Sequence, residues 1–284
     1  MVNGKKIIRI CAISTKRIFT NSRFYLAVLW AMIVFSFNIF GIRDFCVLTQ
    51  ARVAPWIFPL LTKESGNQMF LILGALLLFC DAPFLSPNSQ WQILRAGRKG
   101  WFWGNILYIF FTALCYTLLL AVLPILICIP YVGWSEEWGK VLGTLAQTTA
   151  AARLQLKPFD YRILLYHSPQ EAMLLTILSV WLNVVLIGMV NYTLNLWVRK
   201  GIGTAVSVML GLSPLLITRL LDMTLGYYLS PPLWMSLAYY KWGEYGIGVP
   251  VGYAYGVLIG LILFCIAVSW IGVKKKDLIF QEEV

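Results

Sequence analysis

The sequence predicts an all-α polytopic membrane protein with six transmembrane helices and both termini in the cytoplasm. Three observations predict this fold class: the apolar composition, six long apolar runs, and the concentration of cations on one side of those runs. Hydrophobic residues make up 60% of the chain and charged residues only 12%. Because charged residues make up about 25% of ordinary soluble domains, this composition excludes a soluble globular protein.

The apolar runs define the expected spans. A helix that crosses about 30 Å of hydrocarbon needs about 20 predominantly apolar residues. Runs of about this length lie at 24–42, 67–84, 104–130, 172–197, 202–220 and 251–273. We therefore expect a single membrane domain over 1–284, with an interfacial segment at 1–23, the six-helix domain at 24–273 and a cytoplasmic tail at 274–284.

The charged residues predict the orientation of the spans. The connections on one side carry fourteen cations and four acidic residues, a net charge of +10. Those on the other side carry nine cations and eight acidic residues, which leaves +1. Because cytoplasmic loops carry the excess of Lys and Arg, the first side, with both termini, is predicted to be cytoplasmic. Anionic lipid explains these flanking cations better than nucleic acid, which is not an expected partner.

Residues 5–23 predict an amphipathic helix that lies in the lipid headgroup plane. At about 100° per residue, one face collects the polar side chains of Lys5, Arg9, Lys16, Thr20 and Arg23. The opposite face holds Ile7, Cys11 and Ile18. A basic face with an apolar back is typical of interfacial helices. The alternative is a basic topogenic tail without a defined helix.

The first cytoplasmic connection predicts a short helix between the second and third spans. Helix-start residues at 86–89 precede a mixed run at 90–96, and Gly97 and Gly100 end it. Such a helix exposes Trp91, Leu94, Arg95 and Arg98 to the cytoplasm. It is suited to docking a soluble partner. Alternatively, its apolar side chains rest on the bilayer while its cations bind lipid phosphates.

Two outer connections predict secondary structure outside the six spans. In the longer one, residues 136–156 predict a surface helix that Pro158 ends. In the other, residues 229–238 include Pro231, Pro232 and Trp234, and they are too apolar for a free loop and too short for a span. We expect them to form a re-entrant hairpin whose backbone groups are satisfied by protein or water.

A few polar residues fall within or beside the apolar runs. Asn183, Asn191 and Asn195 lie in the fourth run. Buried asparagines usually join helices, at roughly 0.6–2 kcal/mol each, and the alternative is that these three line a substrate pathway. Asp81 ends the second run, where a salt bridge to Arg95 or Arg98 would act as a structural lock.

Enzyme chemistry has little support in the sequence. The chain has one histidine, His167, and Glu136-Glu137 lacks the arginine that would complete a membrane-protease motif, because Val141 stands at that position. The nearest approach to a phosphate-binding loop, at 133–141, has the wrong spacing. We therefore expect no catalytic residue, bound metal or cofactor in this chain.

The order of these parts resembles the permease subunits of ABC-2 type exporters. The run FCDAPF (79–84), followed by ILRAGRKGWFWGNILYI (93–109), is similar to the junction between the second and third spans in Firmicute members of that group. The similarity covers the whole chain in layout, but only this junction in residues. The outer connection at 131–171 is longer than is usual in the group.

The resemblance implies a role for several parts of the chain. It implies that Trp91, Leu94, Arg95 and Arg98 form a coupling helix that docks on a separate ABC ATPase subunit. It also implies that the hairpin with Pro231, Pro232 and Trp234 is an outer gate. Such permeases pair with a second copy or a sister permease in the bacterial cytoplasmic membrane. Two alternatives stay open: a non-transporting scaffold or sensor that docks a cytoplasmic partner, and a membrane enzyme that uses His167, Glu136 or Glu137.

Overall fold

The computed structural model describes residues 4–84, 87–154, 156, 159–221, 225–243 and 248–275. Regular secondary structure within these ranges is helical, which confirms the predicted all-α class. Five helices are long and apolar enough to cross a membrane. They are α2 (Ser22–Thr49), α5 (Pro87–Ile127), α9 (Pro169–Trp197), α10 (Ile202–Leu215) with its π-helical continuation η1 (Leu216–Leu221), and α12 (Val251–Lys275). The chain is therefore a multi-pass membrane protein.

The expected span at 67–84 is the exception among the six. Helix α4 (Ser65–Phe79) has 15 residues, and at 1.5 Å per residue it rises about 22 Å, less than the thickness of the hydrocarbon layer. It ends early because Pro83 cannot continue a helix and disfavours helical geometry in the residue before it. The four-residue helix α3 (Phe58–Leu61), which is wholly buried, precedes α4.

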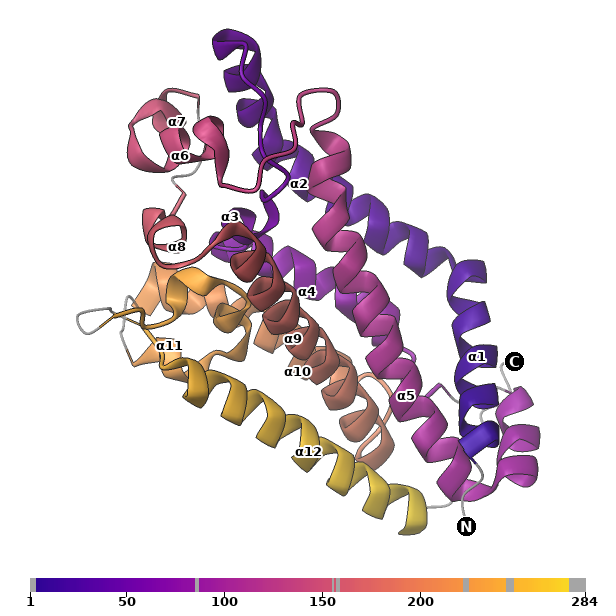
Figure 1. Cartoon of the computed structure of the whole chain (residues 1–284). Helices are drawn as coiled ribbons and strands as arrows, with labels where there is room; N and C mark the ends of the chain where they lie inside the picture. Colours follow the sequence, from indigo (N-terminus) through magenta and orange to yellow (C-terminus); the bar gives the residue numbers. More distant parts are fainter. Residues whose placement is uncertain are drawn as a thin grey trace.

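Helix α4 runs antiparallel to α2, and a polar contact marks each end of their pairing. Near the start of α2, Arg23 forms a salt bridge with Asp81, just beyond the end of α4. Further along α2, Asn38 Nδ2 donates to Asn67 Oδ1 near the start of α4, at 3.1 Å. The part of α2 beyond Asn38 therefore extends past the beginning of α4, as Figure 1 shows at the top of the molecule.

The N-terminal segment forms a helix, α1 (Gly4–Thr20), which ends before Arg23, so that Arg23 belongs to α2 and not to the helix expected at 5–23. The apolar side of α1 packs on protein. Ile10, Cys11 and Ile18 are buried. A Cβ atom on Gly104 of α5 would lie only 2.6 Å from the Ile10 side chain, so α1 and α5 are in close contact. The side chain of Thr20, expected on the polar face, lies outside the described residues. Helix α1 is therefore docked along α5.

The connection at 131–171 differs from expectation. In place of one helix over 136–156, the structure has α6 (Gly139–Gln147) and α7 (Ala150–Arg153), followed by α8 (Tyr161–Tyr166). The break falls at Thr148, whose backbone is extended and whose hydroxyl accepts a hydrogen bond from the Ala150 N–H at 3.2 Å. Threonine side chains compete with helical bonding in this way. Pro158 lies outside the described residues.

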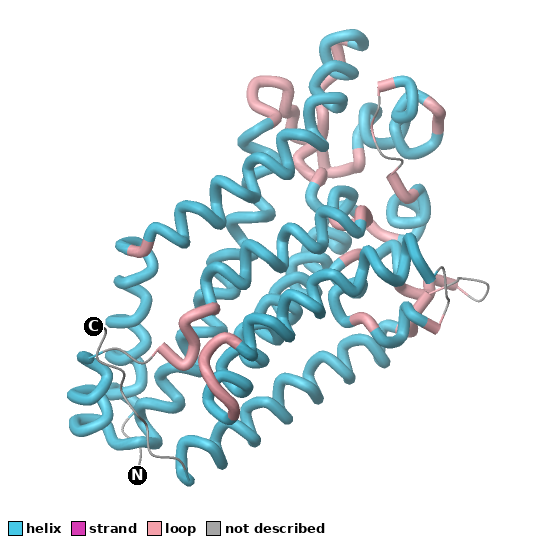
Figure 2. The backbone as a smooth tube through the Cα atoms, turned by 180° about the vertical axis from the view of Figure 1, so that it is seen from behind, coloured by secondary structure: helices cyan, strands magenta, loops and turns pink. Residues whose placement is uncertain are grey.

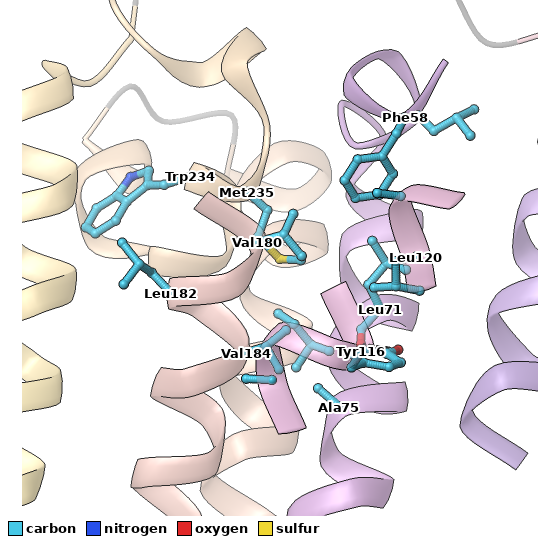
Figure 3. Close-up of a cluster of buried hydrophobic side chains, with 14 of the residues drawn as sticks. Phe58, Leu71, Ala75, Tyr116, Leu120, Val180, Leu182, Val184, Trp234 and Met235 are labelled. Carbon is cyan, nitrogen blue, oxygen red and sulfur yellow. Dashed lines mark hydrogen bonds between the residues drawn. The ribbon is translucent and has the colours of Figure 1, made fainter. Parts of the chain in front are cut away.

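The apolar stretch before α12 folds into the bundle. It consists of α11 (Gly226–Leu229), η2 (Pro231–Met235) and η3 (Leu237–Tyr239), and every residue of η2 is buried. Figure 3 shows Trp234 and Met235 of η2 in the same buried cluster as Val180 and Leu182 of α9. Leu71, Tyr116 and Phe58 extend this core through α4, α5 and α3.

The elements gather at two opposite ends of the bundle (Figures 1 and 2). One end, which we call the cationic end, holds the beginning of α1, residues 87–99 of α5, the turn at Arg199 and Lys200, and the last turn of α12. The other, the loop end, holds α3, α6, α7, α8 and the 226–239 hairpin. This division groups the connections as the charge count predicts.

Candidate functional site

A short helix projects from the cationic end. Residues 87–96 are helical, and Gly97 separates them from the rest of α5 with φ 75° and ψ 162°. That positive φ is accessible to glycine at little cost, so Gly97 lets the chain turn sharply before the long apolar helix. This confirms the helix expected at 90–96. Residues 85 and 86, where its start signal lies in part, are outside the described residues.

The short helix presents two large apolar side chains to its surroundings. Trp91 is 63% exposed and Leu94 is 75% exposed. Arg95 is also exposed, and its carbonyl accepts a hydrogen bond from Lys6 Nζ of α1 at 2.9 Å. Arg98 donates through Nη1 to the Lys274 carbonyl at the end of α12, at 3.2 Å. The short helix and the turn after it are therefore tied to the first and last helices.

Asp81 has a different partner from the ones expected. It pairs with Arg23 at the start of α2, not with Arg95 or Arg98. The same guanidinium donates to Cys80 Sγ at 3.1 Å. The sequence did not reveal this pairing because it depends on α2 and α4 lying side by side. Both side chains of the pair are more than one third exposed.

Asn195 joins three parts of the chain. Its Nδ2 donates to the Ala82 carbonyl after α4, at 2.8 Å. Its Oδ1 accepts from the N–H groups of Gly201 and Gly203 at the beginning of α10, at 3.1 and 2.9 Å. Asn195 is buried, so these bonds satisfy backbone groups that water does not reach.

The other two asparagines of α9 are also buried. Asn191 Nδ2 donates to Ser207 Oγ of α10 at 2.7 Å, and its Oδ1 accepts from Thr204 Oγ1 at 3.2 Å. Asn183 donates to the carbonyl of Ser179 on its own helix, at 2.9 Å. These contacts are typical of polar residues that join helices. A pathway role for Asn183, Asn191 and Asn195 stays a prediction.

The hairpin at the loop end is closely packed. Trp234 Nε1 donates to the Tyr227 carbonyl at 2.8 Å, and the Trp234 carbonyl accepts from the Tyr240 hydroxyl at 2.7 Å. Ser230 and Ser213 of α10 are joined through their hydroxyls at 2.6 Å. Pro231 and Pro232, the other two residues of the expected gate, are buried beside Trp234. Every residue of η2 is thus inside the protein, whereas Leu229 just before it is 75% exposed. A gating role for Pro231, Pro232 and Trp234 stays a prediction.

A cleft near the loop end, which we call the outer cleft, lies beside α2 and α4, and the sequence did not reveal it. It consists of two adjoining cavities of about 340 and 320 Å³, both lined by Asn38, Asn67 and Leu156. The first cavity is also lined by the charged residues Lys63, Glu64 and Arg219. The second is also lined by apolar residues, namely Trp30, Ile33, Val34, Phe37 and Phe70. The only sequence signal was Asn38, a polar residue inside the first apolar run.

Ion pairs organise the charged side of the cleft. Arg219 Nη2 of η1 lies 3.1 Å from Glu64 Oε1, and Lys63 Nζ lies 3.8 Å from Asp160 Oδ2. Asp160 also accepts two side-chain hydrogen bonds from Arg162, at 3.1 and 2.8 Å. Burial alone would raise the pKa of Asp160, but the bonds from Arg162 and the charge of Lys63 outweigh it and lower that pKa.

The residues weighed for an enzyme lie at the loop end. Glu136 and Glu137 are exposed, whereas His167 is buried against the Trp242 ring, with 4.1 Å between the ring centroids. His167 Nδ1 lies 3.2 Å from Glu171 Oε1. His167 and Glu137 line an open cavity of about 1070 Å³ together with Trp134 and Lys140. The structure thus brings His167 and Glu137 to one cavity.

Comparisons of the chain with protein-family models, with curated proteins and with solved structures find no match. The class that the fold defines is therefore the multi-pass helical membrane protein.

Proposed function

We propose that this chain is the membrane-spanning permease subunit of an ATP-binding-cassette exporter, driven by a separate ATPase subunit. The observation that carries the proposal is the short helix at 87–96. It is set apart from the span by Gly97 and exposes Trp91 and Leu94 at the cationic end. An exposed tryptophan beside arginines is typical of a protein-docking surface.

The proposed topology has six crossings of the bacterial cytoplasmic membrane. Five are the long helices, and α3 with α4 and the turn at 80–84 makes the sixth. The antiparallel pairing of α4 with α2, from Asn38–Asn67 to Arg23–Asp81, supports this crossing. An even number of crossings places the start of α1 and the end of α12 on one side of the membrane. The excess of cations there makes that side the cytoplasm.

The mechanism follows from the contacts of the short helix. ATP-driven closure of the ATPase subunits would move the helices docked on them, and Gly97 is the joint between the short helix and α5. The bonds from Lys6 to Arg95 and from Arg98 to Lys274 would carry the movement to α1 and α12. The ATPase biases the permease only if its ATP-bound state binds one permease conformation more tightly. A second copy or a sister permease completes the assembly.

A scaffold or sensor with the same docked partner is the second candidate. One observation favours it: the asparagines of α9 are buried and bonded to neighbouring helices or to α9 itself, and none of them lines the outer cleft. Making Asn183 or Asn191 bulky would disrupt packing in a transporter and in a scaffold alike. Transport in reconstituted vesicles separates the two, because a scaffold moves no cargo when ATP is supplied.

Affinity purification from native membranes tests the docking proposal. The test variant carries Trp91→Ala and Leu94→Asp, which change exposed side chains and leave the bonds of Lys6 and Arg98 in place. The matched control is Trp134→Ala at the loop end, where Trp134 is 81% exposed. We expect an ATPase with a phosphate-binding loop to co-purify with the wild type and the control and to be lost from the test variant.

A second variant, Arg95→Glu with Arg98→Glu, reverses the charge of the same surface and should also lose the ATPase. If no ATPase accompanies the wild type under any condition, or if it stays bound to both variants, the docking proposal is wrong. Size-exclusion chromatography of each variant shows whether it remains folded.

A further inference from the structure

The order of polarity along the outer cleft matches that of a membrane lipid. At its charged side, the cleft is lined by Lys63 and Glu64, just before α4, and by Arg219 on η1. At its apolar side, it is lined by Trp30 and Phe37 of α2 and by Phe70 of α4. Asn38 and Asn67, which line both cavities, lie between the two sides. A molecule that fills the cleft therefore meets charges at one end and hydrocarbon at the other.

The apolar side opens toward the bilayer. Phe37 is 76% exposed and Ile33 is 44% exposed, and both lie on α2, one of the membrane-crossing helices. The rings of Trp30 and Phe70 meet edge to face, with 5.3 Å between their centroids. These residues lie further into the bundle along α2 and α4 than Asn38 and Asn67 do. Acyl chains could therefore enter sideways from the membrane, while the head stays at the level of the helix ends.

The loop end closes the outer rim of the cleft. Leu156 lines both cavities and packs on α2, where a Cβ atom on Gly41 would lie 2.6 Å from its side chain. Phe159 and Tyr239 complete the wall of the charged cavity. Each cavity lies near the lower limit of the roughly 300–1,000 Å³ that is usual for sites of small ligands, and the two adjoin.

The charges indicate the kind of head group. Lys63 and Arg219 are cationic, but Glu64 lines the same cavity, so the site carries both signs. Arg219 uses one nitrogen toward Glu64, and a guanidinium has five N–H donors, so the same group can also bind a phosphate. The carboxylate of Glu64 can accept from an amine. Arg219 belongs to a π-helical turn, a rare geometry that is frequent at functional sites.

We infer that the outer cleft binds a zwitterionic phospholipid, or a lipid-like amphiphile whose head carries a phosphate and an amine. Lys63 and Arg219 hold the phosphate, Glu64 holds the amine, and the acyl chains lie along Trp30, Ile33 and Phe70. As a statement about cargo, this inference rests on the proposed exporter function. As a statement about binding, it concerns this chain alone.

Photolabelling of the purified full-length chain in detergent, without any ATPase, tests the inference. The probe is phosphatidylethanolamine with a photoreactive group in one acyl chain, and the labelled residues are mapped by mass spectrometry. We expect labelling at 30–37 and at Phe70. Unlabelled phosphatidylethanolamine should displace the probe, whereas phosphatidylglycerol, which lacks the amine, and the water-soluble head group glycerophosphoethanolamine should not.

Two variants with matched controls make the test specific. Arg219→Glu should weaken labelling about tenfold, the loss of one charge-assisted contact, whereas Arg153→Glu, an exposed cation that does not line the cleft, should not. Ile33→Trp fills the apolar side and should abolish labelling, whereas Ile259→Trp on the exposed face of α12 should not. Ile33 faces outward, so this second variant tests the inference even if Arg219→Glu fails to fold.

Three results would overturn the inference. Labelling that is equal on α2 and α12 and unchanged by both variants would mean ordinary lipid contact only. Competition by phosphatidylglycerol would remove the requirement for an amine, and competition by the head group alone would mean a soluble ligand. The photolabelling uses no ATPase, so its outcome does not depend on whether an ATPase co-purifies in the docking experiment. The lipid-binding inference and the docking proposal can therefore fail independently.

Discussion

Two connections, one at each end of the bundle, differ in how they place their large side chains. At the cationic end, Trp91 and Leu94 lie on a short helix and are largely exposed. At the loop end, Trp234 and Met235 lie in the hairpin and are fully buried. The charges differ as well, because cations predominate at the first end, whereas the charges at the second are nearly balanced and several of them form ion pairs, as with Asp160 and Arg162.

The short helix thus has the exposure that the proposed docking requires, whereas η2 is already covered by the bundle. Exposed apolar side chains that gather on one surface often mark an interaction site, whereas the apolar side chains of η2 are covered by the bundle. The loop end closes the rim of the outer cleft, and the cationic end carries the proposed docking surface. The comparison predicts that substitutions of the buried hairpin residues reduce stability, whereas those on the exposed face of the short helix reduce binding of the proposed partner.

The largest effect should come from the tryptophan of the hairpin. Trp234→Ala leaves a cavity in the core and removes the hydrogen bond to the Tyr227 carbonyl, so we expect a loss of about 3–5 kcal/mol or no folded protein. Trp91→Ala, on the exposed short helix, should change stability by less than about 0.5 kcal/mol. Thermal unfolding in detergent measures both. Equal losses would show that the short helix is also buried in the protein.

An intermediate effect should come from Asp160 at the loop end. Asp160→Asn removes the carboxylate that Arg162 and Lys63 contact, which should cost roughly 1–3 kcal/mol. The folded protein lowers the pKa of Asp160, so its contribution is present above the ordinary value of 3.8 and is lost as the pH falls through the lowered pKa. Unfolding temperatures measured across this acidic range should therefore fall in the wild type and change less in Asp160→Asn. Parallel curves for the two proteins would contradict the assignment.

The smallest effect should come from Asp81 at the cationic end. Its salt bridge with Arg23 joins two side chains that are both more than one third exposed, so solvent screens it. We expect Asp81→Asn to cost about 0–1 kcal/mol, and to cost less at high salt. The same unfolding assay at two ionic strengths checks this. A loss as large as that of Asp160→Asn would make Asp81 the lock that the sequence suggested.

Hydropathy was enough to predict the long helices, because crossing a lipid layer requires a continuous apolar run of known length. It overestimated the run at 67–84, since Asp81 and Pro83 are single residues in an apolar context and yet the helix ends at Phe79. The short helix at 90–96 was predictable because Gly97 is a local signal. The count of cations also separated the two ends correctly. It requires only the order of the apolar runs along the chain, because successive connections lie at alternate ends of the bundle.

Contacts between distant parts of the chain were not predictable from one sequence. Arg23 pairs with Asp81, and Ile10 packs against Gly104, only because α1, α2, α4 and α5 are neighbours. The outer cleft was missed for the same reason, since Lys63, Asn38 and Arg219 are far apart along the chain. Thr148 was missed because its hydroxyl bond to Ala150 competes with a helical pattern that is otherwise regular.

The central claim is that the two ends lie on opposite sides of the membrane, with the cationic end in the cytoplasm. Leu94→Cys and Trp134→Cys place a thiol on an exposed position at each end, and the wild type gives the background of the native cysteines. A membrane-impermeant maleimide should label Trp134→Cys in intact cells and Leu94→Cys only after the membrane is permeabilised. Labelling of Leu94→Cys in intact cells, or of both positions from the same side, would contradict the account.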